Sequence, residues 1–131
     1  LSSLGPLLTL RRVRFVSLQY DAPEEDLKYF KETFGVSVAQ AEGLDMMNDI
    51  DDIAALIDAT DGVVSANTSV LHLAGALGKP VHMLDYAYAW YTLGTGGYPW
   101  YGDVRYHTRM PGSDWEPQVQ AVAAALGVEF T

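Results

Sequence analysis

Short apolar segments alternate along this chain with segments whose apolar residues recur at helical spacing. Runs rich in β-branched and aromatic residues, bounded by glycine, proline and aspartate, are typical of strands. We expect such strands at residues 14–19, 36–38, 62–65, 81–84 and 104–106. The segment 62–65 is apolar and lies between turn residues, which favours a strand buried on both faces of a parallel sheet.

Four segments repeat apolar residues at i, i+3, i+4 or i+7, the spacing of one helix face. These segments run from 24 to 34, from 50 to 57, from 67 to 77 and from 115 to 126. Gly35, Gly78 and Gly127 follow the first, third and last of them, and glycine commonly ends a helix. We therefore expect four helices, three of them ended by a glycine.

Strand, helix and strand within residues 62–84 predict a βαβ unit, whose two strands are parallel. Extended to the whole chain, this pattern predicts an α/β fold, a Rossmann-like doubly wound parallel sheet of about five strands with helices on both faces. The chain has 131 residues and 49% hydrophobic content, which suits one core. We expect residues 1–131 to form a single Rossmann-like domain.

Composition narrows the range of partners. Seventeen acidic against eight basic side chains give a formal charge of −9, which would repel a nucleic acid backbone. Cysteine is absent, so the chain has neither disulfides nor a thiol nucleophile. No apolar run approaches the roughly 20 residues of a membrane span, and we expect a cytoplasmic location. The first residue is Leu1 rather than Met, so we expect the chain to be a segment of a longer protein or to lack its natural start.

The best candidate for chemistry is the turn between the strand at 62–65 and the next helix. In open parallel sheets, ligands bind beyond the carboxyl ends of the strands. There Ser65 leads into Asn67, Thr68 and Ser69, which begin a helix. The unpaired main-chain amides and the dipole of a helix N-terminus form an anion site, and a diphosphate is the anion we expect.

The same helix carries a polar stripe. Thr68, His72 and Gly75 follow one another at i, i+4 and i+7, so they share one face. This stripe indicates contact with something other than the core. A plainer interpretation stays open, in which Asn67 or Thr68 only caps the helix and His72 is a hydrogen-bonded interior histidine.

Residues 63–81 read V-V-S-A-N-T-S-V-L-H-L-A-G-A-L-G-K-P-V. This segment resembles the nucleotide-sugar signature of heptosyltransferase-like and TPR-linked, O-GlcNAc-transferase-like glycosyltransferases, which are GT-B enzymes. Residues 15–19, F-V-S-L-Q, resemble the strand that opens the second Rossmann half in that group. Residues 98–101, Y-P-W-Y, followed by V-R-Y at 104–106, are similar to its aromatic segment before the last strand.

The resemblance implies that the chain is the C-terminal, nucleotide-sugar-binding half of a GT-B glycosyltransferase. Asn67, Thr68 and Ser69 would then meet the diphosphate, with His72 supporting them, and Gln19 would approach the nucleoside or sugar. It implies a nucleoside-diphosphate sugar as donor for hexosyl or heptosyl transfer, with no cofactor and no metal. The missing N-terminal Rossmann half, or a second copy of the chain, would be the partner, and TPR repeats would be associated.

We assign no catalytic residue, because in this group the base is expected on the missing half, and the segment alone should be inactive. The chain also departs from the family, which usually carries aspartate where this sequence has Asn67. Lys79, the nearest lysine, follows the helix C-terminus rather than the proposed phosphate site. A non-catalytic binding or assembly module that retains the fold is therefore the alternative, and a flavodoxin-like domain with another phosphate ligand is a second.

Residues 90–101 combine aromatic rings, including Trp90 and Trp100, with flexible glycines. This loop is equally suited to two roles. Its rings can stack on a base or sugar, or they can pack against a partner half or a second copy of the chain. The three histidines lack metal-ligand spacing, so we expect no metal site. A Thr68→Pro substitution should remove one amide donor and weaken diphosphate binding about tenfold.

Overall fold

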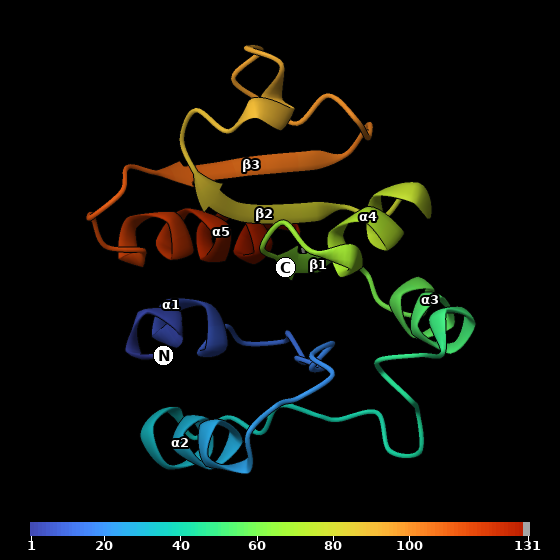
Figure 1. Ribbon diagram of the computed structural model, residues 1–131. Helices are drawn as coiled ribbons and strands as arrows, with labels where there is room; N and C mark the ends of the chain where they lie inside the picture. The colour runs from blue at the N-terminus through green and yellow to red at the C-terminus, as the bar shows by residue number, and fades with distance from the viewer. Residues whose placement is uncertain (130–131) are drawn as a thin grey trace. The chain divides into compact units, whose positions relative to one another are not determined.

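The computed structural model describes residues 1–129. Within them the chain divides into two compact units, which are coloured by residue number in Figure 1. The first unit contains residues 1–49 together with the C-terminal segment from Trp115, and the second contains Ile50–Asp114. The expectation of a single domain stays a prediction.

The first unit is mainly helical. A short 3-10 helix, η1 (Ser2–Leu4), leads into α1 (Gly5–Leu8), which packs against both α2 (Glu24–Phe34) and α5 (Glu116–Glu129). The approach of α1 to α2 is close, because a Cβ atom on Gly5 would lie 2.8 Å from the Phe34 ring. The buried apolar side chains of this unit come from all three α-helices: Leu7, Leu8, Phe30, Val119, Val122, Ala123 and Leu126.

The two strands expected in the first unit, at 14–19 and 36–38, do not form. A single parallel bridge joins Val16 to Ala39 instead. It has two hydrogen bonds, from the Ser17 amide to the Ala39 carbonyl (2.8 Å) and from the Ala39 amide to the Phe15 carbonyl (2.9 Å). An isolated two-stranded pairing is marginal in water, and Val16 remains 36% exposed, so little burial supports a longer ladder.

The second unit contains the sheet. Within residues 1–129 this sheet has three strands, in the order β1 (Val63–Ser65), β2 (Val81–Tyr86), β3 (Val104–Arg109). Both pairings are parallel, and Val63, Val81 and Val104 lie side by side at their start. The α/β fold with a parallel sheet is therefore confirmed, whereas the expected five strands are reduced to three.

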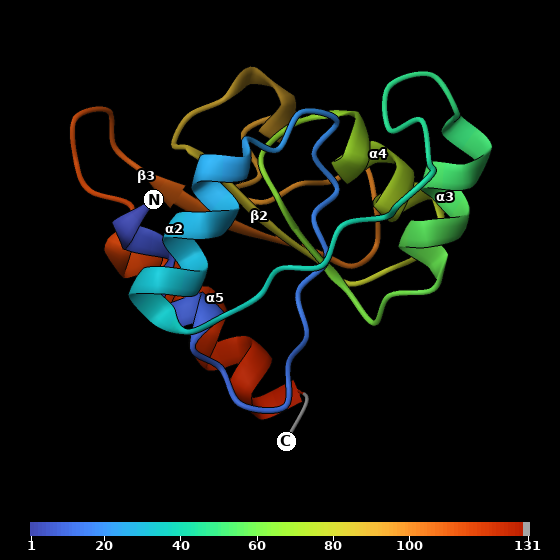
Figure 2. The same cartoon turned by 90° about the horizontal axis from the view of Figure 1, so that it is seen from below.

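One helix connects β1 to β2. This helix, α4 (Ser69–Ala76), packs against both strands, and α3 (Ile50–Asp58) packs against α4. Figure 2 shows α3 and α4 side by side. The central strand β2 buries Val81, His82 and Met83 in succession, which requires cover on both of its faces. The predicted βαβ unit is thus confirmed.

Glycine ends two of the helices as expected, but not the last. Gly35 caps α2 in the left-handed conformation, with φ of 68°, and Gly78 adopts φ of 71° two residues beyond α4. The expected end of the last helix at Gly127 is wrong, because α5 continues to Glu129. A glycine inside a helix costs only about 1 kcal/mol relative to alanine, so it weakens the helix without ending it.

The helices are short compared with a bilayer. The longest helix within residues 1–129, α5, has 14 residues, whereas a transmembrane helix needs roughly 20. No helix within residues 1–129 is both long and apolar enough to cross a membrane. The cytoplasmic location stays a prediction.

Two histidines meet inside the sheet. The His82 Nδ1 atom of β2 lies 3.0 Å from the His107 Nε2 atom of β3, and the rings are stacked with centroids 5.2 Å apart. Burial lowers the pKa of both rings, and the charge of Arg105 lowers it further, while Asp103 opposes this at His82. Both imidazoles are therefore neutral at neutral pH, and one donates its N–H to the other.

This pair predicts a loss of stability in mild acid. Each folded-state pKa lies below the ordinary value of 6.5, so below that pH the unfolded chain binds more protons than the folded chain. The free energy of unfolding should fall as the pH drops from about 7.5 to about 5.5, and thermal denaturation will show a lower Tm.

The double variant His82→Leu/His107→Leu serves as the control, because removing both partners leaves no unpaired buried ring. It should lose clearly less Tm over the same pH interval. An equal loss in both proteins would show that other groups cause the acid sensitivity.

Candidate functional site

The turn between β1 and α4 exposes main-chain amides. β1 ends at Ser65, the next residues through Ser69 are exposed, and α4 begins at Ser69. Thr68 precedes the helix in an extended conformation, with φ of −132° and ψ of 175°. Among the described residues, no acceptor takes a hydrogen bond from the amides of Ser69 and Val70. These donors and the helix dipole favour an anion.

The hydroxyl groups of the turn bond to each other and to the turn itself. Ser65 donates to the carbonyl of Ala66 at 2.9 Å, and its Oγ lies 3.2 Å from the Thr68 hydroxyl. Thr68 occupies the N-cap position of α4, as the plainer interpretation expects, but its side chain makes no capping hydrogen bond. Hydrogen bonds within the turn hold its conformation. The amides of Ser69 and Val70 have no hydrogen-bond acceptor among the described residues, and we call them open amides.

The expectation that the Thr68 amide is a free donor is wrong. This amide donates to the Ala66 carbonyl at 2.9 Å and closes a tight turn. A proline at Thr68 would break that turn rather than simply remove a donor for the ligand. The free donors begin one residue later, at Ser69.

Two residues of the polar stripe of α4, His72 and Gly75, contact the aromatic segment that precedes β3. The Tyr101 hydroxyl lies 3.0 Å from the His72 Nδ1 atom. A Cβ atom on Gly75 would lie 2.5 Å from the Tyr101 ring, so this ring rests directly on the glycine. His72 is exposed, so its interpretation as an interior histidine is wrong. The stripe thus packs against the chain's own aromatic segment, and its contact with a ligand stays a prediction.

Four tyrosines, Tyr91, Tyr98, Tyr101 and Tyr106, form what we call the tyrosine cluster. Tyr98 is its centre, with ring centroids 5.7 Å from Tyr91, 6.2 Å from Tyr101 and 6.5 Å from Tyr106. Burial raises the pKa of Tyr98, with Tyr101 and Asp85 acting in the same direction, so its hydroxyl stays protonated. That hydroxyl donates to Asn67 Oδ1 at 3.4 Å.

The start of the aromatic loop is tied to the end of β2. The Tyr91 hydroxyl donates to the Asp85 carboxylate, which also accepts the amide of Tyr86 at 2.7 Å. Trp90 packs edge-on against Tyr91 and is 81% exposed. Trp100 donates its indole N–H to the Tyr91 carbonyl at 2.8 Å and is 52% exposed. Both tryptophan rings therefore lie at the surface, where a base or sugar can stack on them.

Arg109 places a positive charge at the carboxyl edge of the sheet, and the sequence patterns did not predict this. Arg109 is the last residue of β3 and lies beside Tyr86, the last residue of β2. Its guanidinium stacks over the Tyr86 ring at 4.8 Å and donates to its hydroxyl at 2.9 Å. The expected strand stopped at residue 106, because the residues that follow it are polar, and Arg109 therefore fell outside the expected edge.

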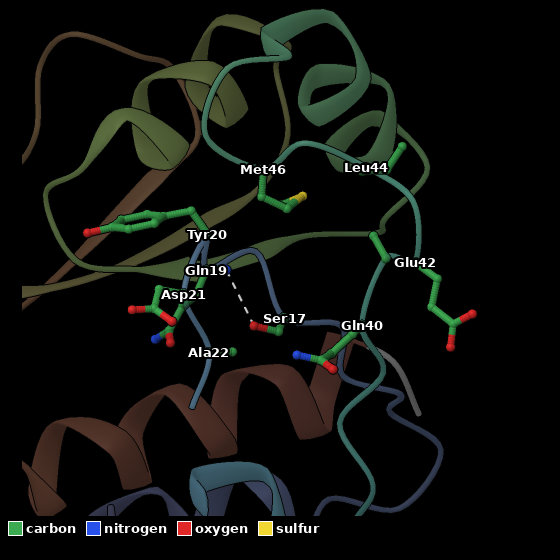
Figure 3. Close-up of a pocket in the computed structure, with 10 residues that line it drawn as sticks. Ser17, Gln19, Tyr20, Asp21, Ala22, Gln40, Glu42, Leu44 and Met46 are labelled. Atoms are coloured by element: carbon green, nitrogen blue, oxygen red, sulfur yellow. Dashed lines mark hydrogen bonds between the residues drawn. The ribbon is translucent and has the colours of Figure 1, made fainter. Parts of the chain in front are cut away.

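The first unit has a pocket of its own, of about 290 Å³. It lies where the chain leaves the Val16–Ala39 bridge, and two loops line it: Ser17, Gln19, Tyr20, Asp21 and Ala22 from one, and Gln40, Ala41, Glu42, Leu44 and Met46 from the other. Figure 3 shows the Gln40 carboxamide pointing toward Ser17, while the Glu42 carboxylate is turned away. The main-chain N–H of Gln19 donates to Ser17 Oγ at 3.3 Å.

The expected site residues thus fall into two places. Around the second unit's sheet edge lie most of them: Ser65, Asn67, Thr68, Ser69, His72, Trp90 and Trp100. Gln19 belongs to the pocket of the first unit. Within residues 1–129, no three side chains of the metal-ligating types come together.

A relative of this chain is the protein FlbA of Caulobacter vibrioides. The two are 44% identical over 121 residues, which cover 92% of this chain and 20% of FlbA. The chain thus spans about a fifth of the length of this relative. No known protein family and no solved structure match the chain.

The contact between Gly75 and Tyr101 can be tested by Gly75→Ala. The added methyl group would displace the Tyr101 ring and break the His72 contact, which should cost about 1–3 kcal/mol of unfolding free energy, offset by about 1 kcal/mol because alanine favours the helix more than glycine. Urea denaturation followed by fluorescence measures this. Gly102→Ala is the matched control, because no atom lies within 4 Å of its added Cβ. Equal stability of the two variants would contradict the packing described.

Proposed function

We propose that this chain is the nucleoside-diphosphate-sugar-binding part of a glycosyltransferase, with the diphosphate at the N-terminus of α4. The observation that carries the proposal is the pair of open amides of Ser69 and Val70, at an exposed helix start beyond a parallel strand. Such amides and the aligned dipole of the helix bind phosphate groups in α/β folds. The resemblance of residues 63–81 to nucleotide-sugar signatures supports the same ligand.

The side chains around this helix start are suited to an anion. The Tyr98 hydroxyl donates a hydrogen bond to the Oδ1 atom of Asn67. The side-chain nitrogen of Asn67 therefore keeps both of its N–H groups as donors for a ligand. The family usually carries a carboxylate at this position, and the neutral amide of Asn67 adds no negative charge beside the proposed diphosphate. The departure from the family pattern is therefore compatible with binding.

The nucleoside or sugar would be held by the surface rings. Trp90 and Trp100 are exposed on the loop that follows β2, and flat aromatic rings stack on bases and on the apolar faces of sugars. Arg109 contributes positive charge to the carboxyl edge of the same sheet. These features favour a nucleotide sugar over inorganic phosphate alone.

In the complete enzyme, the reaction would be metal-independent glycosyl transfer to an acceptor. The amides of α4 would stabilise the negative charge that develops on the departing diphosphate. The base that activates the acceptor would come from a second Rossmann half. The match covers only 20% of FlbA, so a protein of that size has room for such a half.

The substitution Ser69→Pro tests the proposal. Proline is favoured at the first position of a helix, and Thr68 before it is already extended, so the variant should fold normally. It removes one open amide. Calorimetric titration with UDP, GDP and ADP should show an affinity at least about tenfold lower for whichever nucleotide the unmodified protein binds.

Ser69→Ala is the matched control, because it removes the hydroxyl and keeps the amide. It should bind the nucleotide within about twofold of the unmodified protein, less than the loss of one hydrogen bond to a charged group. Equal affinity in the proline variant, or no affinity for any of the three nucleotides in the unmodified protein, would contradict the proposal. The second result would favour the non-catalytic binding or assembly module.

A further inference from the structure

One edge of the sheet in the second unit offers main-chain groups for a further strand. β2 lies between β1 and β3, so β3 is an edge strand among the described residues, as Figure 1 shows. The other edge strand, β1, has only three residues, whereas β3 has six. The edge of a strand is a row of N–H and C=O groups that can pair with another chain.

The direction of these groups follows from the pairing of β3 with β2. The carbonyls of Asp103 and Arg109 accept the amides of Val81 and Ala87 on the β2 side. Because the main-chain groups of successive strand residues point to opposite sides, the residues between 103 and 109 at even positions face away from β2. Val104 and Tyr106 are two of them, and their main-chain groups have no main-chain partner among the described residues.

The charge of this edge is opposite to that of the whole chain. Arg105 and Arg109 are four residues apart on β3 and therefore share one face of the sheet. Residues 104–113 contain these two arginines and no acidic residue, in a chain of net charge −9. Arg105 is exposed, and the contacts of Arg109 with Tyr86 leave its positive charge in place. The edge thus favours a negatively charged partner.

We propose that the β3 edge binds an extended, acidic peptide segment of a partner protein, which joins the sheet as an added strand. Main-chain hydrogen bonds to Val104 and Tyr106 hold the peptide, and its carboxylates lie beside Arg105 and Arg109. The proposal goes beyond nucleotide-sugar binding and holds whether or not the start of α4 binds a diphosphate.

A second copy of the chain fits this edge less well than an acidic peptide. If two β3 strands paired antiparallel with His107 at the centre, Arg105 of each copy would lie opposite Arg109 of the other. Like charges directly opposite each other destabilise a strand pair, whereas opposite charges stabilise it. The arginines therefore favour an acidic strand over the chain's own edge.

The other face of β3 sets a second requirement for the peptide. Val104, Tyr106 and Thr108 alternate with the residues of the arginine face and are partly buried. These are β-branched or aromatic residues, which pair well with β-branched residues on a neighbouring strand. The peptide E-V-T-V-E-V-T meets both requirements, because its valines share one face and its two glutamates lie four residues apart on the other.

The test is a titration of the full chain, labelled with nitrogen-15, with this peptide at pH 8. The backbone amide signals of Val104 and Tyr106 should move downfield and saturate at roughly 0.1–1 mM peptide. The charge-reversed peptide K-V-T-V-K-V-T should bind at least about fivefold more weakly. The peptide E-P-P-V-E-V-T, whose successive prolines donate no main-chain hydrogen bond, should be weakened by a similar factor of about five.

Arg105→Glu tests the contribution of charge. It should weaken binding of E-V-T-V-E-V-T at least about fivefold, because a carboxylate then meets the glutamates of the peptide. Arg11→Glu is the matched control, since it changes the net charge equally at an exposed arginine of the first unit and leaves the second unit's sequence unaltered. This control should bind within about twofold of the unmodified protein.

Val104→Pro tests the main-chain pairing. Proline is tolerated at the first residue of a strand and at a strand edge, so the variant should fold, but it lacks the outward N–H of Val104. Binding of the acidic peptide should fall about fivefold, the loss of one hydrogen bond. Val104→Ala is the matched control, because it keeps this N–H, and it should bind within about twofold of the unmodified protein.

Three results would overturn the proposal. The first is that E-V-T-V-E-V-T leaves the Val104 and Tyr106 signals unchanged, in which case the arginines only keep strand edges apart. The second is that Arg105→Glu and Arg11→Glu bind the peptide equally well. The third is that the same two signals move when the unmodified chain is concentrated without peptide, which would indicate a second copy as the occupant.

Discussion

The parallel pairing of β1 with β2 is the constraint on which the second unit depends. Parallel strands require a crossover, and here α4 supplies it within the residues between Ser65 and Val81. A connection this short places the start of α4 directly beyond the carboxyl end of β1. The main-chain amides of Ser69 and Val70 therefore face away from the strand. No acceptor in the described turn takes a hydrogen bond from them.

The tyrosine cluster connects the loop after β2 to the turn before α4. From Asp85, hydrogen bonds and ring contacts lead through Tyr91 and Tyr98 to Asn67, beside the start of α4. Tyr101 makes a second connection, because its ring rests on Gly75 and its hydroxyl contacts His72. The helix start and the aromatic loop are thus held as one piece of structure, which orders the candidate site before any ligand arrives.

Local sequence patterns predicted the second unit better than the first. The βαβ unit follows from apolar runs and a helical repeat that lie close together in the chain, and Gly78, two residues beyond α4, adopts the left-handed conformation that glycine allows. The strands expected at 14–19 and 36–38 have suitable residue types but too few neighbours to bury them. The preference of a residue for strands depends on burial of its side chain as much as on its backbone. Residue types alone therefore predict strands wrongly where little burial is available.

The site was predictable in part for the same reason. The turn from Ser65 to Ser69 is local, and its exposed position followed from the pattern. The His82–His107 contact depends on the register between two strands, which single residues do not reveal. The Thr68 amide is engaged by a turn of three residues, and the sequence does not distinguish that turn from a simple helix start.

Inorganic pyrophosphate tests the central claim most directly, because it contains the anion without base or sugar. In a titration of the nitrogen-15-labelled chain, the amide signals of Ser69 and Val70 should move downfield and saturate, and they should move more than any other backbone signals. Larger shifts elsewhere, with these two signals unchanged, would contradict the account.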